Sequence, residues 1–114
     1  MAYDPSLAER VRLTLRKAAL QTAPREIRMF GGLCFTVSGH MCCGIVGRDL
    51  VVRVGPEGLR DALARPHARP MDFTGRPLNG FVYVGPAGCR RGVDLVHWVR
   101  RALAFVGTLP PKAR

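Results

Sequence analysis

The chain has 114 residues, 47% of them apolar, which is enough to bury one compact core without disulfides or metals. Lysine and arginine number 18 against 8 aspartate and glutamate, so the net charge is +10 and polyanions are attracted. No segment approaches the roughly 20 apolar residues that cross a bilayer, and no export signal opens the chain. We therefore expect one cytoplasmic domain over residues 1–114, with 108–114 as a flexible tail and no membrane partner.

The first half of the chain predicts a helix followed by a three-stranded antiparallel meander. Asp4 and Pro5 are typical of a helix start, and the helix should end before Pro24. The segments 28–37, 41–46 and 50–54 have the alternating apolar or β-branched residues of strands, with glycine-containing turns between them. The apolar stripe of the helix comprises Leu7, Val11, Leu15 and Ala18.

The second half predicts a short helix, two strands and a final helix. Residues 56–64 form the short helix, and a loop rich in proline and arginine runs to Pro70. Residues 71–74 form a short strand, 75–77 a turn and 81–84 a second strand. The last helix begins at about Asp94, and its buried face is formed by Leu95, Trp98 or Val99, Ala102 and Val106.

This order predicts an α+β fold of two layers, with an antiparallel sheet that has helices on only one face. The other face requires a partner or polar side chains. Phe81 and Tyr83 alternate with Val82 and Val84, so the last strand is apolar on both sides. We expect a homodimer that covers the open face.

The sequence predicts no metal site, no cofactor and no enzyme. Adjacent Cys42 and Cys43 should point to opposite faces of a strand, and no C-x-x-C pair is present. No nucleophile elbow or phosphate-binding glycine loop occurs, and only spatial convergence of His40, His67 and His97 would make one of them a base. The thiol and imidazole groups considered as zinc ligands are those of Cys34, His40, Cys42, Cys43 and Cys89.

Cys89 is the one cysteine whose neighbours in the sequence favour a reactive thiol. It lies in an expected loop directly before Arg90 and Arg91, whose charge would favour the thiolate. A thiol switch at Cys89 is therefore one alternative function, and an exposed cysteine of no consequence is the other interpretation.

A second alternative is weak, salt-sensitive association with nucleic acid through the arginine-rich surface. Arginine suits phosphate, but aromatic residues are not interleaved as in proteins that bind single strands. Scattered arginines also form ordinary solvated surfaces. The candidate contacts are Arg65, His67, Arg69, Arg76, Arg90 and Arg91.

Gly31-Gly32 lacks side chains, so the backbone there can adopt unusual conformations or approach another group closely. We interpret the pair as a bulge or tight packing point within the first strand, and a backbone approach to a ligand is the alternative.

Several motifs together resemble one family. They cover nearly the whole chain and also include Trp98 and Leu109-Pro110-Pro111: Arg28-Met29-Phe30-Gly31-Gly32-Leu33, Met41-Cys42-Cys43-Gly44-Ile45-Val46, Leu50-Val51-Val52-Arg53-Val54-Gly55, Arg69-Pro70-Met71-Asp72-Phe73-Thr74-Gly75-Arg76-Pro77 and Gly80-Phe81-Val82-Tyr83-Val84. With these motifs the chain resembles the N-terminal domain of TfoX/Sxy proteins.

The resemblance implies an α-β(3)-α-β(2)-α fold similar to type III secretion chaperones. It also implies a link to regulators of natural competence, which act with the cyclic-AMP receptor protein at promoters. It brings no catalytic residues, so we expect a stand-alone, non-enzymatic module that contacts itself and an unidentified protein. The shared positions are then fold determinants, namely Met29, Phe30, Gly31, Gly32, Gly80, Phe81 and Tyr83.

Overall fold

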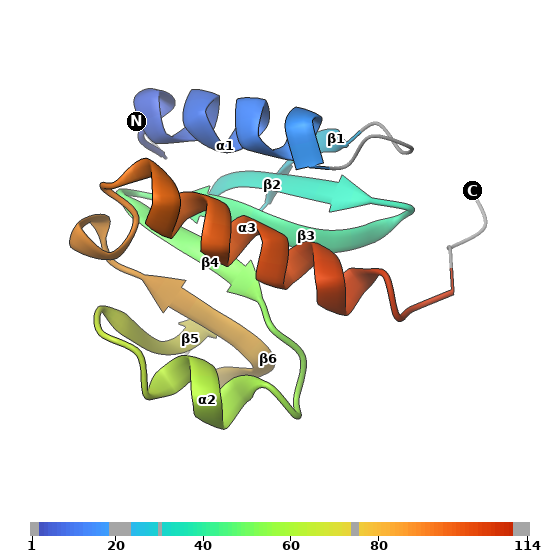
Figure 1. Cartoon of the computed structure of the whole chain (residues 1–114), viewed down its shortest axis with the longest axis vertical. Coiled ribbons are helices and arrows are strands. Elements are labelled where there is room, and N and C mark those ends of the chain that lie inside the picture. The colour runs from blue at the N-terminus through green and yellow to red at the C-terminus, as the bar shows by residue number, and fades with distance from the viewer. Residues whose placement is uncertain (1–2, 19–23, 30, 74–75, 111–114) are drawn as a thin grey trace.

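The computed structural model describes residues 3–18, 24–29, 31–73 and 76–110, with the backbone alone at 73 and 76–78 (Figure 1). Over these residues the chain forms three α-helices, one short 3₁₀-helix and six strands. In chain order the elements are α1 (Pro5–Ala18), β1 (Arg25–Met29), β2 (Gly32–Val37), β3 (His40–Val46), β4 (Asp49–Arg53), α2 (Leu59–Leu63), β5 (Ala68–Phe73), β6 (Arg76–Val84), η1 (Pro86–Gly88) and α3 (Gly92–Val106).

The six described strands form one sheet in the order β1-β2-β3-β4-β6-β5, and all neighbours are antiparallel. Figure 1 shows α3 lying across the sheet, α1 beside it above β2, and α2 against the β5–β6 end. The predicted α+β class with an antiparallel sheet is confirmed.

All three described helices contribute to one core with alternate residues of the sheet. Asp4 caps α1 as predicted, since its Oδ1 accepts hydrogen bonds from the backbone N–H of Ser6 (2.9 Å) and Leu7 (3.4 Å). Because all three described helices pack into this one core, the other face of the sheet carries no helix among the described elements. The core residues include Leu7, Val11, Leu15, Leu33, Phe35, Ile45, Leu50, Val52, Ala62, Val82, Val84, Leu95, Trp98, Val99, Ala102 and Val106.

The prediction of a single strand over residues 28–37 is wrong, because this stretch is a hairpin. Met29 pairs directly with Gly32, and Gly31 has a φ of +70°, which suits a two-residue turn. Four strands therefore precede α2, instead of the three in the expected order. The tight-packing interpretation holds for Gly32, where a Cβ atom would lie 2.1 Å from the carbonyl oxygen of Ile45.

The predicted turn at residues 75–77 is wrong for Arg76 and Pro77. Arg76 pairs with Phe73, and Pro77 pairs with Asp72, so both belong to β6. Residues 74 and 75 lie outside the described residues. Strand β5 already begins at Ala68, inside the segment expected to be a loop, because it pairs with β6 at the sheet edge.

Residues 108–110, which belong to the expected tail, make hydrogen bonds to the domain. The Thr108 hydroxyl donates to the carbonyl oxygen of Phe105 (2.6 Å), and His40 Nε2 lies 2.6 Å from the carbonyl oxygen of Pro110. Residues 111–114 lie outside the described residues. Among the helices that the structure describes, none has the length and hydropathy needed to span a membrane.

Candidate functional site

The sheet face opposite the helices is crossed by one row of paired residues that runs over all six described strands. At its centre Cys34 and Val51 are each only 1% exposed, although neither belongs to the core beneath the helices. Gly44 lies between them, where a Cβ atom would be 2.6 Å from the carbonyl oxygen of Leu33. From β1 to β5 the row is Ile27, Cys34, Gly44, Val51, Tyr83 and Arg69.

Arginines cover the aromatic side chains on this face. The guanidinium of Arg69 lies 4.8 Å from the centre of the Tyr83 ring, and its Nη2 is 2.6 Å from Asp49 Oδ2. Arg53 lies 5.4 Å from the ring centre of Phe81 and also 5.4 Å from that of Phe105 on α3, so its guanidinium reaches toward the helix side. The face that we expected to be open and apolar is therefore covered at Tyr83 by the side chain of Arg69.

The exposed apolar part of the same face lies at β1. Ile27 is 48% exposed and Met29 is 39% exposed, and both alternate with the charged residues Glu26 and Arg28. No described strand pairs with the outer edge of β1. This edge combines unpaired backbone groups with exposed apolar side chains, which is the usual starting point for strand addition.

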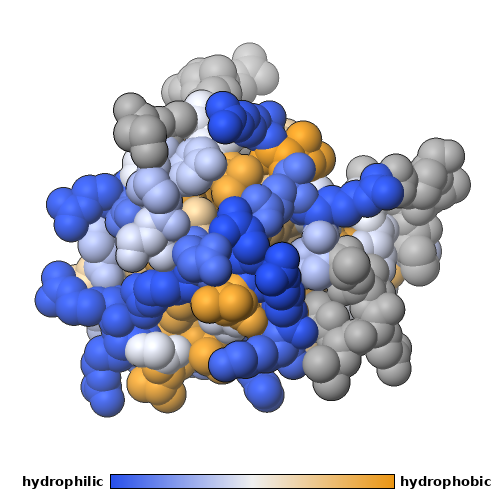
Figure 2. All heavy atoms as spheres, turned by 90° about the horizontal axis from the view of Figure 1, so that it is seen from above, coloured by the Kyte–Doolittle hydropathy of each residue, from blue (hydrophilic) through white to orange (hydrophobic). Residues whose placement is uncertain are grey.

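A second apolar patch lies on the helix side, in a hollow of about 210 Å³ between α1 and α3. Leu13 and Val96 line it together with Lys17 and Arg100. Figure 2 shows apolar surface among hydrophilic side chains on the side of the molecule that carries α1. This hollow is small, and basic side chains border it.

The six residues predicted to contact anions do not form one site. Arg65 and His67 line a cavity of about 260 Å³, whereas Arg69 is held by Asp49. Arg90 lines a different hollow, and Arg91 is exposed directly before α3. The side chain of the sixth residue, Arg76, lies outside the described residues.

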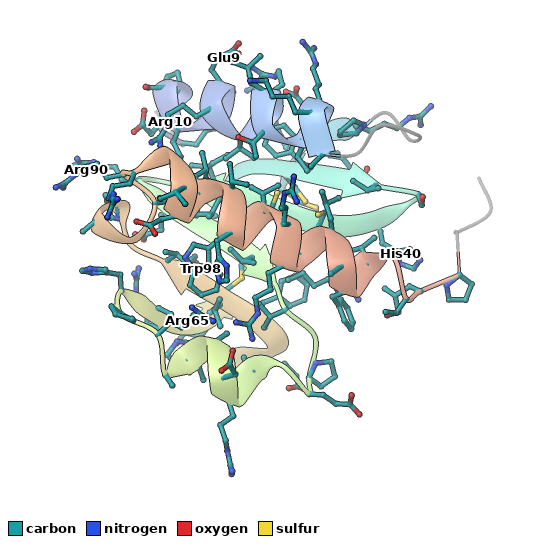
Figure 3. The ribbon with its side chains drawn as sticks, in the orientation of Figure 1. Glu9, Arg10, His40, Arg65, Arg90 and Trp98 are labelled. Carbon is teal, nitrogen blue, oxygen red and sulfur yellow. The ribbon has the colours of Figure 1, made fainter. Side chains whose placement is uncertain are left out.

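The 260 Å³ cavity brings together two of the three histidines, which sequence spacing alone could not establish. His67 and His97 line it with Arg65, Asp94 and Trp98. His67 has a φ of +70°, and its carbonyl oxygen accepts a hydrogen bond from the N–H of Gly85 (2.9 Å). Figure 3 shows Arg65 below Trp98. In the same figure His40 lies apart from both, near the C-terminal end of α3.

Three arginines line the other hollow, of about 150 Å³, and sequence reasoning identified only one of them. Arg10 of α1 donates from Nη2 to the carbonyl oxygens of Cys89 (2.9 Å) and Arg90 (2.9 Å), so the η1–α3 loop holds its guanidinium. Arg48 comes from the β3–β4 turn. Figure 3 shows Arg10 and Arg90 at the same end of the molecule. Only the fold reveals this cluster, because its members are about 40 residues apart in the sequence.

The exposed position expected for Cys89 is wrong. The residue is 1% exposed, and its Sγ lies 3.7 Å from the carbonyl oxygen of Gly85. Burial raises the pKa of the Cys89 thiol, which outweighs the opposite effect of nearby Arg10. The thiolate that a reactive cysteine needs is therefore disfavoured.

The prediction that Cys42 and Cys43 point to opposite faces is also wrong. Phe35 pairs with Cys43 while Thr36 pairs with Met41, so Cys42 is the extra residue of a β-bulge. Both thiols belong to the core, and the thiol of Cys42 together with burial raises the pKa of Cys43 well above its usual range. Within the described part of the chain, no group of three or more His, Cys, Asp or Glu residues is placed to hold a metal ion.

Comparison with known proteins assigns the family. The family model of the TfoX N-terminal domain matches residues 20–106, which include every strand, α2 and α3. The chain belongs to the TfoX N-terminal domain family. No curated protein and no solved structure matches it significantly. Helix α1 precedes the matched range, so the family's own pattern is concentrated in the sheet and the two later helices.

The glycines that we expected to determine the fold have structural roles here. Gly80 has a φ of +90°, and its carbonyl oxygen accepts the N–H groups of Val54 (2.8 Å) and Gly55 (3.0 Å). Gly31 and Gly32 form the β1–β2 turn and a close strand contact. Phe81 and Tyr83 lie beneath arginines, Met29 is exposed on β1, and Phe30 lies outside the described residues.

Proposed function

We propose that this TfoX N-terminal domain is a non-catalytic regulatory module that acts through protein contacts and pairs with a second copy of itself. The observation that carries the proposal is β1, an edge strand whose outer side pairs with no described strand and whose Ile27 and Met29 are exposed on the sheet face that has no described helix. Such an edge gains both backbone hydrogen bonds and apolar contacts when another chain adds to it.

The arginines of the helix-free face support the same function. Arg69 covers the ring of Tyr83 within one chain, which reduces the apolar surface that β6 offers to a partner on this face. On the helix-free face, the large apolar side chains that remain exposed are Ile27 and Met29 at the β1 end. An edge contact of this kind is small, so the expected affinity is that of a transient regulatory interaction.

The mass of the purified chain in solution tests self-association. The mass measured by light scattering over a concentration series should rise from the 12.5 kDa of one chain toward twice that value. A constant mass of one chain at all concentrations, up to about 1 mM, would contradict pairing. The matched variants are Ile27→Asp on β1 and Val93→Asp, which is 64% exposed on α3 and should leave the mass unchanged.

We extend the proposal to the regulation of natural competence, in line with the TfoX family. A chromosomal deletion should lower the frequency of transformation, and the Ile27→Asp variant should fail to restore it while Val93→Asp restores it. Equal restoration by both variants would show that the role in competence does not depend on the β1 edge.

A second candidate function is weak nucleic-acid binding by Arg10, Arg48 and Arg90, which line one hollow. Binding of labelled duplex and single-stranded DNA should fall steeply as salt rises, because the contacts are to phosphates. Arg48→Gln should weaken it more than Arg60→Gln, an exposed arginine on α2. Binding that survives physiological salt and differs between sequences would favour this function over protein contacts.

A further inference from the structure

The two faces of strand β1 carry different kinds of side chain. By register with β2, Ile27 and Met29 lie on the helix-free face, opposite Cys34 and Gly32. Glu26 lies on the helix side, where Arg12 of α1 binds it with a distance of 2.8 Å between Nη2 and Oε1. Arg12 lowers the pKa of Glu26, so this residue is a fixed negative charge beside the edge.

The backbone groups of β1 that face outward can be assigned from the hairpin. Met29 pairs with Gly32 across a two-residue turn, and such a closing pair exchanges both of its backbone hydrogen bonds. Bonded pairs alternate along the ladder, so Ile27 also directs its N–H and C=O toward β2. Glu26 and Arg28 therefore direct theirs away from the sheet.

We propose that the outer edge of β1 pairs antiparallel with β1 of a second copy of this chain, about a two-fold axis at Ile27. Glu26 then lies opposite the partner's Arg28, and the backbone groups of these two residues, which face outward, bond across the interface. Ile27 lies opposite the partner's Ile27 on the helix-free face. The two sheets become one continuous sheet.

The charges select this register. Residues that pair across strands have their side chains on the same face, so Glu26 meets the partner's Arg28 twice, once on each side of the axis. A two-fold axis at Glu26 would place two glutamates opposite each other, and an axis at Arg28 would place two arginines opposite each other. Both like-charge pairings are destabilising. An axis between two residues would leave the outward backbone groups without matching partners.

The inference rests on the proposed self-association and specifies its geometry, so a cross-link at the axis tests it. Central residues of this pairing form a non-hydrogen-bonded pair, whose Cα atoms are about 4.5 Å apart and within disulfide range. Ile27→Cys should therefore give a disulfide-linked dimer under mild oxidation. Val93→Cys is the control, and the native cysteines Cys34, Cys42, Cys43 and Cys89 are buried.

Charge reversals in the Ile27→Cys background test the register. Arg28→Glu places glutamates opposite each other twice and should lower the association constant roughly tenfold. Arg25→Glu makes the same chemical change on the same strand but faces the partner's Met29, so it should lower the constant much less. Circular dichroism confirms that each variant is folded.

The outcomes separate the register from self-association itself. Rapid cross-linking at position 27, lost with Arg28→Glu and kept with Arg25→Glu, supports the inference. A wild-type dimer by mass without preferential cross-linking at position 27 overturns the inference and leaves the proposed self-association standing. A monomeric mass at all concentrations without cross-linking overturns both. Equal losses with the two charge reversals overturn the register.

Discussion

At the scale of single residues, glycines permit the closest strand contacts. Gly44 of β3 would place a Cβ atom 2.6 Å from the carbonyl oxygen of Leu33 and 3.3 Å from the Cα of Cys34. Those atoms belong to the backbone of β2, so the sheet itself would have to shift. We expect Gly44→Ala to lower the free energy of unfolding by about 2–3 kcal/mol, measured by urea denaturation.

Gly92 provides the matched control for that substitution. It begins α3, and no heavy atom lies within 4 Å of a Cβ placed there. Gly92→Ala should leave the free energy of unfolding unchanged or raise it by up to about 1 kcal/mol, because alanine favours the helix. Equal losses for both glycines would show that the strand contact at Gly44 is not the cause.

The buried thiols predict how stability depends on pH. Burial, with a smaller effect of Cys42, raises the pKa of Cys34 to about 11. The native state then keeps a proton that the unfolded chain loses above about pH 9, so stability is present below that pH and falls toward pH 11. The slope per such thiol is at most about 1.4 kcal/mol per pH unit.

Urea titrations between pH 7.5 and 10.5 measure this slope. Cys34→Ala should have a shallower slope than wild type, since one of the perturbed thiols is absent. Cys43 and Cys89, whose pKa values are also raised, should keep part of the slope in that variant. A wild-type stability that does not fall over this range would contradict the prediction.

At the scale of elements, α2 is too short to be stable alone and depends on α3. Arg101 of α3 binds Asp61 of α2 (2.8 Å), and it donates to the carbonyl oxygen of Gly58 (2.9 Å). The Arg101 side chain is only 18% exposed, but that of Asp61 is 67% exposed, so water screens the ion pair and the hydrogen bond to Gly58 is the better protected contact. A helix of five residues lacks the length for independent stability.

Arg101→Met should therefore loosen α2 while keeping an apolar stem of similar length. We expect a loss of about 1–2 kcal/mol in the free energy of local opening, seen as faster hydrogen exchange of the amides of Ala62 and Ala64. Arg100→Met, which changes an exposed neighbour, should leave both rates unchanged. Similar exchange in the two variants would rule out the contacts of Arg101 as the support of α2.

The elements also show how far the sequence determines the fold. The apolar stripes of α1 and α3 were predictable because a helical repeat depends on local spacing. The β1–β2 hairpin was missed because Gly31-Gly32 suits a bulge and a turn equally well until a pairing partner is known. Burial of Cys89 and convergence of Arg10, Arg48 and Arg90 arise from tertiary packing, for which a local pattern has no signal.

At the scale of the whole molecule, the net charge of +10 opposes the association of two copies and favours the binding of nucleic acid. Two copies repel each other over distances of about a Debye length, and added salt screens that repulsion. The exposed Glu26 pairs with the partner's Arg28 contribute at most about 1 kcal/mol each. Nucleic acid is attracted by the same charge, and salt weakens that attraction.

One salt series from 0.05 to 0.5 M therefore distinguishes the two functions. Self-association through β1 should strengthen or hold as salt rises, because backbone hydrogen bonds and the Ile27 contact do not depend on ionic strength. Anisotropy of a labelled duplex in the same samples should report DNA binding that falls with salt. If the mass by light scattering fell in parallel with DNA binding, ion pairs would be the main attraction between copies. The sheet edge would then not be the principal contact.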